Sequence, residues 1–521
     1  MPGTRCDVLI VGGGTGGCAA AMAATSLGLH TIMVEETDWI GGQLTSQGVP
    51  PDEHPWIEEF GCTQRYRTFR ELVRDYYRSF YPLTERALKE PFLNPGRGWV
   101  SKLCFEPKVG VAVLEQMLAF PSSAGLLQIR RNSQMVSAEV SGDRILAIEV
   151  HNQASGSTET IEAKIFIDSS ELGELLELAK IEHVIGAESR KETGEPHAVD
   201  GPAQPLNQQG FTWCFAMGFD PEEGTKVEAP AAYEFWKDYR PEFWPGPLLS
   251  WTTSQPITHE PKVWTLFPPL DGGLGLFDYR QIISRDLYGP GVMPGEVTAV
   301  NWPQNDYWLK PLVGVPADTA QQALSESREL SLSLIYWLQN EGGEPGVTLR
   351  PEVFGTPDGF AKAPYVRESR RIQAMTTVIE QHVSTECNPG LDRAPGFRDS
   401  VGVGCYRIDL HPTTSGDDYL DISTVPFEIP LGALIPVRAA NLIAGCKNIG
   451  TTHITNGCFR LHPVEWNIGE SAGTLAAFCL LSGRSPRDVL LNGQTVGEFQ
   501  ELLLRQGIEI HWPADVMLRP V

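Results

Sequence analysis

The stretch DVLIVGGGTGG, residues 7–17, decides how this chain of 521 residues begins to fold. Its apolar run, residues 8–11, predicts a buried parallel strand, and the glycines that follow predict a tight turn. The alanine-rich segment 16–27 predicts a helix, and TIMVE at 31–35 predicts a second strand that ends in an acid. Strand, glycine turn, helix, strand and acid in this order are typical of a βαβ unit that binds the ADP half of a dinucleotide.

Each of these positions has a physical role in such a unit. Gly12 allows the tight turn, Gly14 lets the backbone approach a pyrophosphate, and Gly17 lets helix and strand pack closely. The helix N-terminus offers unpaired N–H groups and a positive dipole end to the phosphates. Glu35 is placed to accept hydrogen bonds from the ribose, and its charge disfavours a 2′-phosphate.

A second glycine doublet follows the acid, in the segment WIGGQLT at 39–45. This doublet resembles the loop by which glutathione-reductase-like flavoproteins hold the rest of FAD. Such a loop has no clear use for NAD alone, and many flavoproteins carry the glycine motif close to the first residue. We therefore expect FAD as the cofactor.

Composition and charge exclude several kinds of partner. The formal net charge of −24 and the pI near 4.9 argue against nucleic acid and anionic membranes as partners. No apolar run approaches the roughly 18 residues that span a bilayer, and the first strand starts by Cys6, which leaves no visible signal peptide. The ten cysteines form no C-x-x-C pair, which favours reduced, mostly buried thiols. We expect a cytoplasmic protein without membrane insertion.

Hydrophobic periodicity and turns predict the elements after the first unit. Residues 63–80 and 108–120 predict helices, and three alternating segments predict a β-meander, at 127–140, 144–151 and 158–163. The apolar strand 164–168 then ends in Ser169-Ser170, where flavoproteins with two dinucleotide folds often carry Ala-Thr-Gly. Further elements are predicted as helices at 318–340, 465–481, 485–488 and 495–506, and as a buried strand at 441–445.

The middle of the chain differs in composition from its two ends. Seven of the 13 tryptophans lie between residues 210 and 310, where prolines are also dense. This pattern predicts a separate domain that covers the substrate. Its rings either form a small core, which we favour for most of them, or stack on a sugar or cyclic substrate.

We therefore predict an α/β fold: a doubly wound, Rossmann-like and glutathione-reductase-like FAD domain with a β-meander and an inserted α+β substrate domain. The predicted divisions are the first part of the FAD domain at 1–205, the substrate or cap domain at 206–360, the second part of the FAD domain at 361–490, and a C-terminal helical segment at 491–521.

Polar residues gather in three segments of the last third of the chain. These are YVRESRR at 365–371, VGVGCYRIDLHP at 403–412 and GTTHITNGCFRLHPVEWNIGESAG at 450–473. With the N-terminal motif they resemble the bacterial FAD-dependent oxidoreductase family, whose members carry R-E-x-R-R, D-x-H-P and H-P-x-E-W-N-I-G-E-x-A-G. The resemblance implies FAD, a glutathione-reductase-like FAD domain and redox activity, and it leaves the substrate open. It also leaves the flavin linkage open; an unlinked flavin is the default expectation.

Histidines and arginines of these segments are the catalytic candidates. Oxidation of a substrate by flavin needs a base, and imidazole titrates near neutral pH. We favour His411, since an alternating strand would put Asp409 on the same face, and place His462 second. Arg367 and Arg460 would anchor a carboxylate or balance the reduced flavin. The histidine spacing matches no metal-binding template, so we expect no metal.

The sequence thus predicts an FAD-dependent oxidoreductase that dehydrogenates a small hydroxyl- or amine-bearing substrate by hydride transfer to flavin N5. A reductase of an activated double bond, a monooxygenase and a flavin-binding structural or partner protein remain alternatives. The direction of reaction, the electron acceptor and the oligomeric state stay open. The residues expected to bind FAD are Gly12, Gly14, Thr15, Gly16, Gly17, Glu35, Glu36, Gly42, Gln43, Val136, Ser169, Asn456, Gly469 and Glu470.

Overall fold

The computed structural model describes residues 4–220, 225–270, 272–293 and 295–521. Its main sheet has the strand order β3-β2-β1-β6-β5-β4, and β21 also pairs with β6. Strands β3, β2, β1, β6 and β21 are parallel, whereas β5 and β4 continue the sheet as an antiparallel ribbon. The bounds are β1 Thr4–Val11, β2 Thr31–Val34, β3 Leu127–Arg130, β4 Ser133–Ser141, β5 Arg144–Asn152, β6 Thr158–Asp168 and β21 Leu442–Ala444.

Two helices from opposite ends of the sequence cross on this sheet, α1 (Thr15–Ser26) and α12 (His462–Ser482). Small residues permit the crossing: a Cβ on Gly469 would lie 2.0 Å from Gly16 O, and one on Gly473 would lie 2.3 Å from Ala20 O. Helix α12 begins at His462, so Gly469 is an interior packing residue. The main sheet therefore combines β1, near the start of the sequence, with β21, which lies more than 400 positions later.

The predicted meander is partly corrected by the strand pairing. Segment 127–140 is two strands, since Asn132 has a positive φ of 52° between them; β3 joins the parallel sheet and β4 the ribbon. The segments predicted at 158–163 and 164–168 are one strand, β6. Its first half pairs with β5 and its second half lies between β1 and β21.

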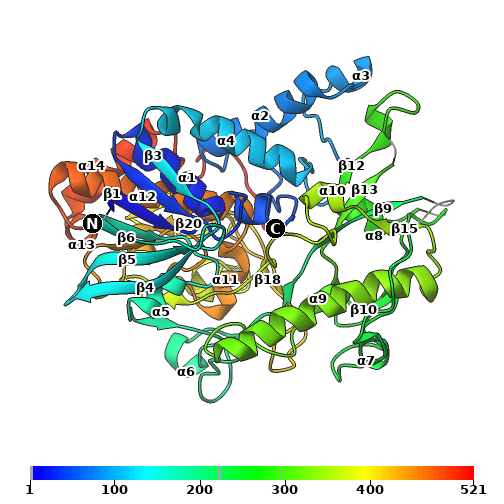
Figure 1. Ribbon diagram of the computed structural model, residues 1–521. Helices are drawn as coiled ribbons and strands as arrows, with labels where there is room; N and C mark the ends of the chain where they lie inside the picture. The colour runs from blue at the N-terminus through cyan, green and yellow to red at the C-terminus, as the bar shows by residue number, and fades with distance from the viewer. Residues whose placement is uncertain (1–3, 221–224, 271, 294) are drawn as a thin grey trace.

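A second, antiparallel sheet lies in the middle of the chain, with the order β12-β13-β9-β15. Its strands are Gln281–Ile283, Val297–Val300, Phe215–Phe219 and Val347–Leu349. Beside it, a core cluster contains Trp236, Trp244, Trp302, Trp308 and Trp337 together with helix α9 residues such as Leu330 and Leu334. Most tryptophans of this region are thus core residues, as we favoured. Helix α9 (Ala317–Asn340) runs along this part of the molecule (Figure 1).

The predicted helices are confirmed within a few residues, and the remaining elements are short. Longer helices are α2 Gln64–Phe80, α4 Pro107–Ser123, α13 Pro486–Leu491 and α14 Gly493–Arg505. Shorter ones are α3 Glu85–Leu88, α5 Glu174–Leu178, α6 Arg190–Thr193, α7 Tyr233–Asp238, α8 Leu276–Tyr279, α10 Pro351–Phe354 and α11 His453–Phe459. Short strands are β7 His183–Val184, β8 Phe211–Thr212, β10 Thr252–Ser254, β11 Pro261–Val263, β14 Asp306–Tyr307, β16 Arg371–Ile372, β17 Ser400–Gly404, β18 Ile408–Leu410, β19 Leu420–Ile422 and β20 Phe427–Pro430.

Two further observations concern the cysteines and the hydropathy of the helices. All ten cysteines are free thiols, and nine of them are buried. Among the helices of the described residues, none combines the length and apolar character that crossing a bilayer requires.

Candidate functional site

The glycine turn after β1 forms one wall of a groove. Gly12 has a φ of +96°, and a Cβ there would lie 2.1 Å from Ser169 O. A Cβ on Gly17 would lie 2.0 Å from Gly12 O, and one on Gly16 would lie 2.1 Å from Gly445 O. These three positions therefore require glycine, and the turn brings the N-terminus of α1 to the groove.

The groove has the lining expected of a dinucleotide site. Gly12, Gly14 and Gly42 line it, as do the acids at the end of β2, Glu35 and Glu36. Glu35 accepts hydrogen bonds from the N–H groups of Gly13 and Thr37, both at 2.9 Å.

Buried polar atoms at this groove also fit the cofactor. Ser169 Oγ and Gln47 Nε2 have no hydrogen-bond partner among the residues that the structure describes, and both residues line the groove. Gln43 Oε1 and Arg460 Nε are likewise buried and unpartnered within the described part of the chain. Burying unpaired polar groups is costly, so these atoms are suited to form hydrogen bonds with a polar ligand. The residues present therefore fit FAD.

Acidic side chains stand in front of the glycine turn. Glu465 Oε1 accepts a hydrogen bond from Gly16 N at 3.2 Å, and Glu171 forms an ion pair with Lys447. A Cβ on either Gly14 or Gly42 would lie 3.2 Å from Glu171 Oε1. The flexible end of Glu171 therefore occupies space at the turn and would have to move for a diphosphate to bind there.

Among the other residues predicted to bind the cofactor, Thr15 and Gln43 hold the glycine turn and its neighbouring loop, whereas Val136 points elsewhere. The Thr15 hydroxyl donates to Gly41 O at 2.9 Å, and Gln43 Nε2 donates to Glu465 Oε2 at 2.8 Å. Val136 is 44% exposed and is not among the groove residues, whereas its neighbours Ser133 and Met135 line the groove.

Asn456 and Glu470 have partners elsewhere. Asn456 Oδ1 accepts from Gln209 Nε2 at 3.4 Å, and buried Glu470 pairs with Arg65 at 2.5 Å. Gly469 packs against α1, as described above. The closing signature thus supports the helix crossing more than it lines the groove.

His411 lies between two carboxylates beside a second cavity. Its Nδ1 is 2.6 Å from Asp306 Oδ2, and its Nε2 is 3.6 Å from Asp409 Oδ2. The expected Asp409–His411 proximity on β18 is therefore present, but Asp306 is the closer partner. Hydrogen bonding to Asp306 fixes the proton on Nδ1 and leaves Nε2 as the basic nitrogen.

Two buried arginines hold these carboxylates. Arg367 Nη2 is 3.0 Å from Asp306 Oδ1, and Arg460 Nη2 is 3.0 Å from Asp409 Oδ2. Burial alone would raise the pKa of Asp306, but Arg367 and His411 hold this pKa below its ordinary value. The two arginines predicted to be catalytic are thus positioned to orient the acids that flank His411.

The cavity beside His411 has a volume of about 260 Å³. Asp409 and Arg280 contribute polar groups to its wall, and the aromatic part of the wall consists of Trp99, Trp264, Tyr279, Trp302, Tyr406 and Tyr419. Size and lining suit a small polar molecule with an apolar face.

A polar chain joins this cavity to the glycine doublet. Gln43 Nε2 donates to Arg460 O at 3.1 Å, and Arg460 in turn donates to Asp409. The N-terminal nucleotide loop is therefore in direct contact with the residues that surround His411.

His462 has a different environment from His411. Its Nδ1 accepts from Asp52 N at 3.0 Å and its Nε2 lies 3.1 Å from Val49 O. Burial lowers the pKa of His462 to about 3. Both nitrogens are hydrogen-bonded to backbone, so the structure places this histidine as an anchor of the 49–52 segment.

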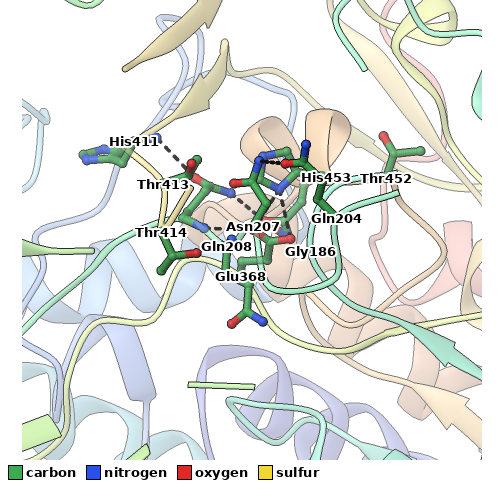
Figure 2. A network of polar contacts seen from close by, with 12 residues as sticks. Gly186, Gln204, Asn207, Gln208, Glu368, His411, Thr413, Thr414, Thr452 and His453 are labelled. Atoms are coloured by element: carbon green, nitrogen blue, oxygen red, sulfur yellow. Dashed lines mark hydrogen bonds and ion pairs between the residues drawn. The ribbon is translucent and has the colours of Figure 1, made fainter. Parts of the chain in front are cut away.

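His453 lines another cavity, of about 410 Å³, which shares Tyr419 with the cavity beside His411. Its Nδ1 is 2.9 Å from Glu368 Oε2, and Figure 2 shows the pair beside the neighbouring segments 204–208 and 411–414. Glu368 also pairs with Arg371. Arg371 thus belongs to an ion-pair network with Glu368 and Glu188.

One group in the described residues has the geometry for a metal ion. Ligand atoms of His197, Glu380 and Glu386 lie within 4.8 Å of one another. Glu386 is exposed and His197 Nδ1 is already hydrogen-bonded to Glu380 at 2.7 Å. The absence of a metal stays a prediction.

Sequence reasoning missed Asp306 and Arg280. Asp306 belongs to the two-residue strand β14 and Arg280 lies between α8 and β12, both in the tryptophan-rich region. Neither stands in a motif. The signal that the sequence carries is the tryptophan-rich composition of this region, which predicts a domain that covers the substrate.

A dinucleotide groove joined to a histidine–carboxylate cavity defines a nucleotide-dependent redox enzyme. Residues 7–503 match the family model described as FAD dependent oxidoreductase. The chain belongs to this family, so its class is oxidoreductase and its cofactor is FAD. No curated protein matches the chain.

Matching solved structures are distant. They include L-proline dehydrogenase from P. horikoshii, at 14% identity over 35% of this chain and 24% of that chain, with a TM-score of 0.19. Glycerol-3-phosphate dehydrogenase from Bacillus halodurans complexed with FAD matches at 13% identity over 41% and 40%, with a TM-score of 0.24. The myxobacterial chondrochloren halogenase CndH matches at 10% identity over 99% and 85%, with a TM-score of 0.34. The chain thus spans at most two fifths of the two dehydrogenases, and such low scores say nothing about its substrate.

Proposed function

We propose that the protein dehydrogenates a small polar substrate bearing a hydroxyl or amine, with His411 as the base. The observation that supports this proposal most strongly is His411 in the wall of a 260 Å³ cavity, held from behind by the buried Asp306. FAD bound in the groove would supply the hydride acceptor. His411 Nε2 would accept the substrate proton while Asp306 holds Nδ1–H.

The flanking acids support this role through charge. Asp409 faces Nε2 and Asp306 faces Nδ1, so the imidazolium formed on proton transfer has a carboxylate on each side. Arg367 and Arg460 keep both acids ionised and fixed. The base is therefore positioned by groups that the reaction does not consume.

We further propose that FAD is held in the glutathione-reductase-like manner. The support is local: Gly41 and Gly42 have positive φ values of 110° and 54°, and a Cβ on Gly42 would lie 2.9 Å from Gly14 Cα. Gly12, Gly14, Thr15, Gly16 and Glu35 would hold the ADP half. Gln43, Gln47 and Arg460 would hydrogen-bond the flavin half.

The same proposal divides the chain as the sequence predicts. Residues 206–360 would form the cap, because they have their own sheet and their own aromatic core. The segments 1–205 and 361–490 would build the FAD domain, since β21 and α12 pack on β6 and α1. Residues 491–521 would close it, in a cytoplasmic protein.

Anaerobic reduction of the bound flavin tests the function. Purified protein is expected to be yellow, and one class among sugars, polyols, hydroxy acids, amino acids and amines is expected to bleach it without oxygen. Bleaching by NADH alone would favour a reductase or monooxygenase. A flavin that no member of the panel reduces would contradict the proposal.

A further inference from the structure

The cavity beside His411 contains a buried cation with unused hydrogen-bonding capacity. The Arg280 side chain is only 9% exposed and lines the cavity. Its Nε and Nη1 atoms have no hydrogen-bond partner among the residues described by the structure. The nearest acid is Asp52, whose Oδ1 lies 3.6 Å from Nη1, too far for a hydrogen bond.

The other arginines around His411 are more fully engaged: Arg367 and Arg460 each leave only Nε without a partner among the described residues, and neither lines the cavity. Arg367 and Arg460 each donate to a carboxylate at 3.0 Å, and both also donate to backbone carbonyls. Arg407 pairs with Asp421. A buried guanidinium with unsatisfied N–H groups destabilises the fold unless something binds it. Of the four arginines, Arg280 is the one that lines the cavity with two nitrogen atoms lacking a partner among the described residues.

The rest of the cavity agrees with an anionic ligand. Lys262 stands in the wall with its ammonium over the Trp264 ring, 3.7 Å from the centroid, and makes no ion pair within the described ranges. Asp409 and Asp421, the acids of the wall, are both neutralised by arginines. The free charges that a ligand meets are therefore positive.

We propose that Arg280 anchors a carboxylate of the substrate, which makes the substrate a hydroxy acid or amino acid rather than a neutral polyol, sugar or amine. The inference rests on the proposed function, since it names the substrate class of the same cavity. The planar guanidinium matches a carboxylate with two parallel hydrogen bonds. The substrate carboxylate would bind the Arg280 guanidinium at hydrogen-bonding distance, whereas Asp52 Oδ1 lies 3.6 Å from Nη1.

Ligand binding tests the anchor without turnover. Isothermal titration calorimetry would compare benzoate with benzamide, and acetate with acetamide, on the purified flavoprotein. We expect each acid to bind more tightly than its amide. Arg280→Gln is expected to weaken binding of the acids about 10- to 100-fold, with little effect on the amides, and Arg280→Lys is expected to lie between. The exposed Arg484→Gln is the matched control.

A second variant keeps the test independent of how Arg280→Gln folds. Asp52→Asn removes the competing charge and leaves Arg280 in place, so the acids are expected to bind several-fold more tightly while the amides do not change. Acids that bind no better than amides, in the wild type and in Asp52→Asn, would overturn the anchor.

Flavin bleaching separates this inference from the proposed function. Matched pairs such as lactate with lactamide, and mandelate with mandelamide, would be compared anaerobically. Bleaching by the amides as fast as by the acids would overturn the anchor and leave the dehydrogenase. Preferential binding of acids with no bleaching by any compound would leave the anchor and overturn the dehydrogenase.

Discussion

The glycine groove and the His411 cavity are built on opposite physical principles. In the groove, Gly12, Gly16 and Gly17 work because side chains are absent, and backbone atoms approach within 2.0–2.1 Å of where a Cβ would be. In the cavity, function depends on side chains that carry charge and fix one another. The groove is therefore sensitive to added volume, and the cavity to a change of charge at constant volume.

The largest expected effect comes from adding one methyl group to the groove. Gly12→Ala strains a φ of +96° and drives Cβ into Ser169 O at 2.1 Å. We expect a loss of about 3 kcal/mol or more in the free energy of unfolding and purification without FAD, measured by denaturation and by the flavin spectrum.

Gly28→Ala is the matched control for this change. Gly28 also has a positive φ, +86°, but a Cβ there meets nothing within 4 Å in the described structure. Its expected loss is only about 1–2 kcal/mol, with FAD retained. Equal losses in the two variants would show that close packing does not define the groove.

In the cavity, the largest effect is expected for His411→Asn. Removing the base should lower kcat about 10²- to 10⁴-fold while the protein stays yellow, because His411 does not line the groove. The exposed His30→Gln serves as the control. If His411→Asn lost FAD rather than turnover alone, cofactor binding and catalysis would not be separated between the groove and the cavity.

Asp306→Asn is expected to act through the orientation of His411. The amide cannot hold Nδ1–H as the carboxylate does, so kcat should fall about 10²-fold and the pH–rate profile should shift. Asp409→Asn should affect turnover less, since Asp409 is 3.6 Å from the ring rather than 2.6 Å. An unchanged pH profile in Asp306→Asn would assign Asp306 a purely structural role.

The smallest effect concerns charge in the groove. Burial raises the pKa of Glu465 to about 7, so this carboxyl is neutral at pH 6 and ionised at pH 8, where it repels a diphosphate. FAD affinity, followed by flavin fluorescence, should fall up to about tenfold over this interval.

Glu465→Gln should reduce the pH dependence of FAD affinity without removing it, because burial also raises the pKa of the groove residues Glu35 and Glu36, to about 7 and about 8. The half-buried Glu498→Gln should leave the pH dependence unchanged. A wild-type affinity that rises with pH would contradict the sign of this effect.

The two regions also differ in how far the sequence predicts them. The βαβ unit could be predicted because its strand, turn, helix and acid lie within 30 residues and each follows a local rule. The position of Asp409 beside His411 follows from strand alternation. Asp306 could not be predicted, because its contact with His411 spans 105 residues and depends on the pairing of the short strands β14 and β8. The hydrogen bonds of His462 to backbone at 49–52 could not be predicted either, because they join residues more than 400 positions apart, and a catalytic role of His462 stays a prediction.

The crossing of α1 and α12 has a consequence for biosynthesis. The glycine turn is synthesised before the residues that pack against it at Gly16, namely Gly445, Glu465 and Gly469, which follow more than 400 positions later. Contacts of such sequence separation form slowly and late. The glycine turn therefore reaches its final packing only after residues 445–469 have been made, and we expect FAD loading to report this late packing rather than to guide the start of folding.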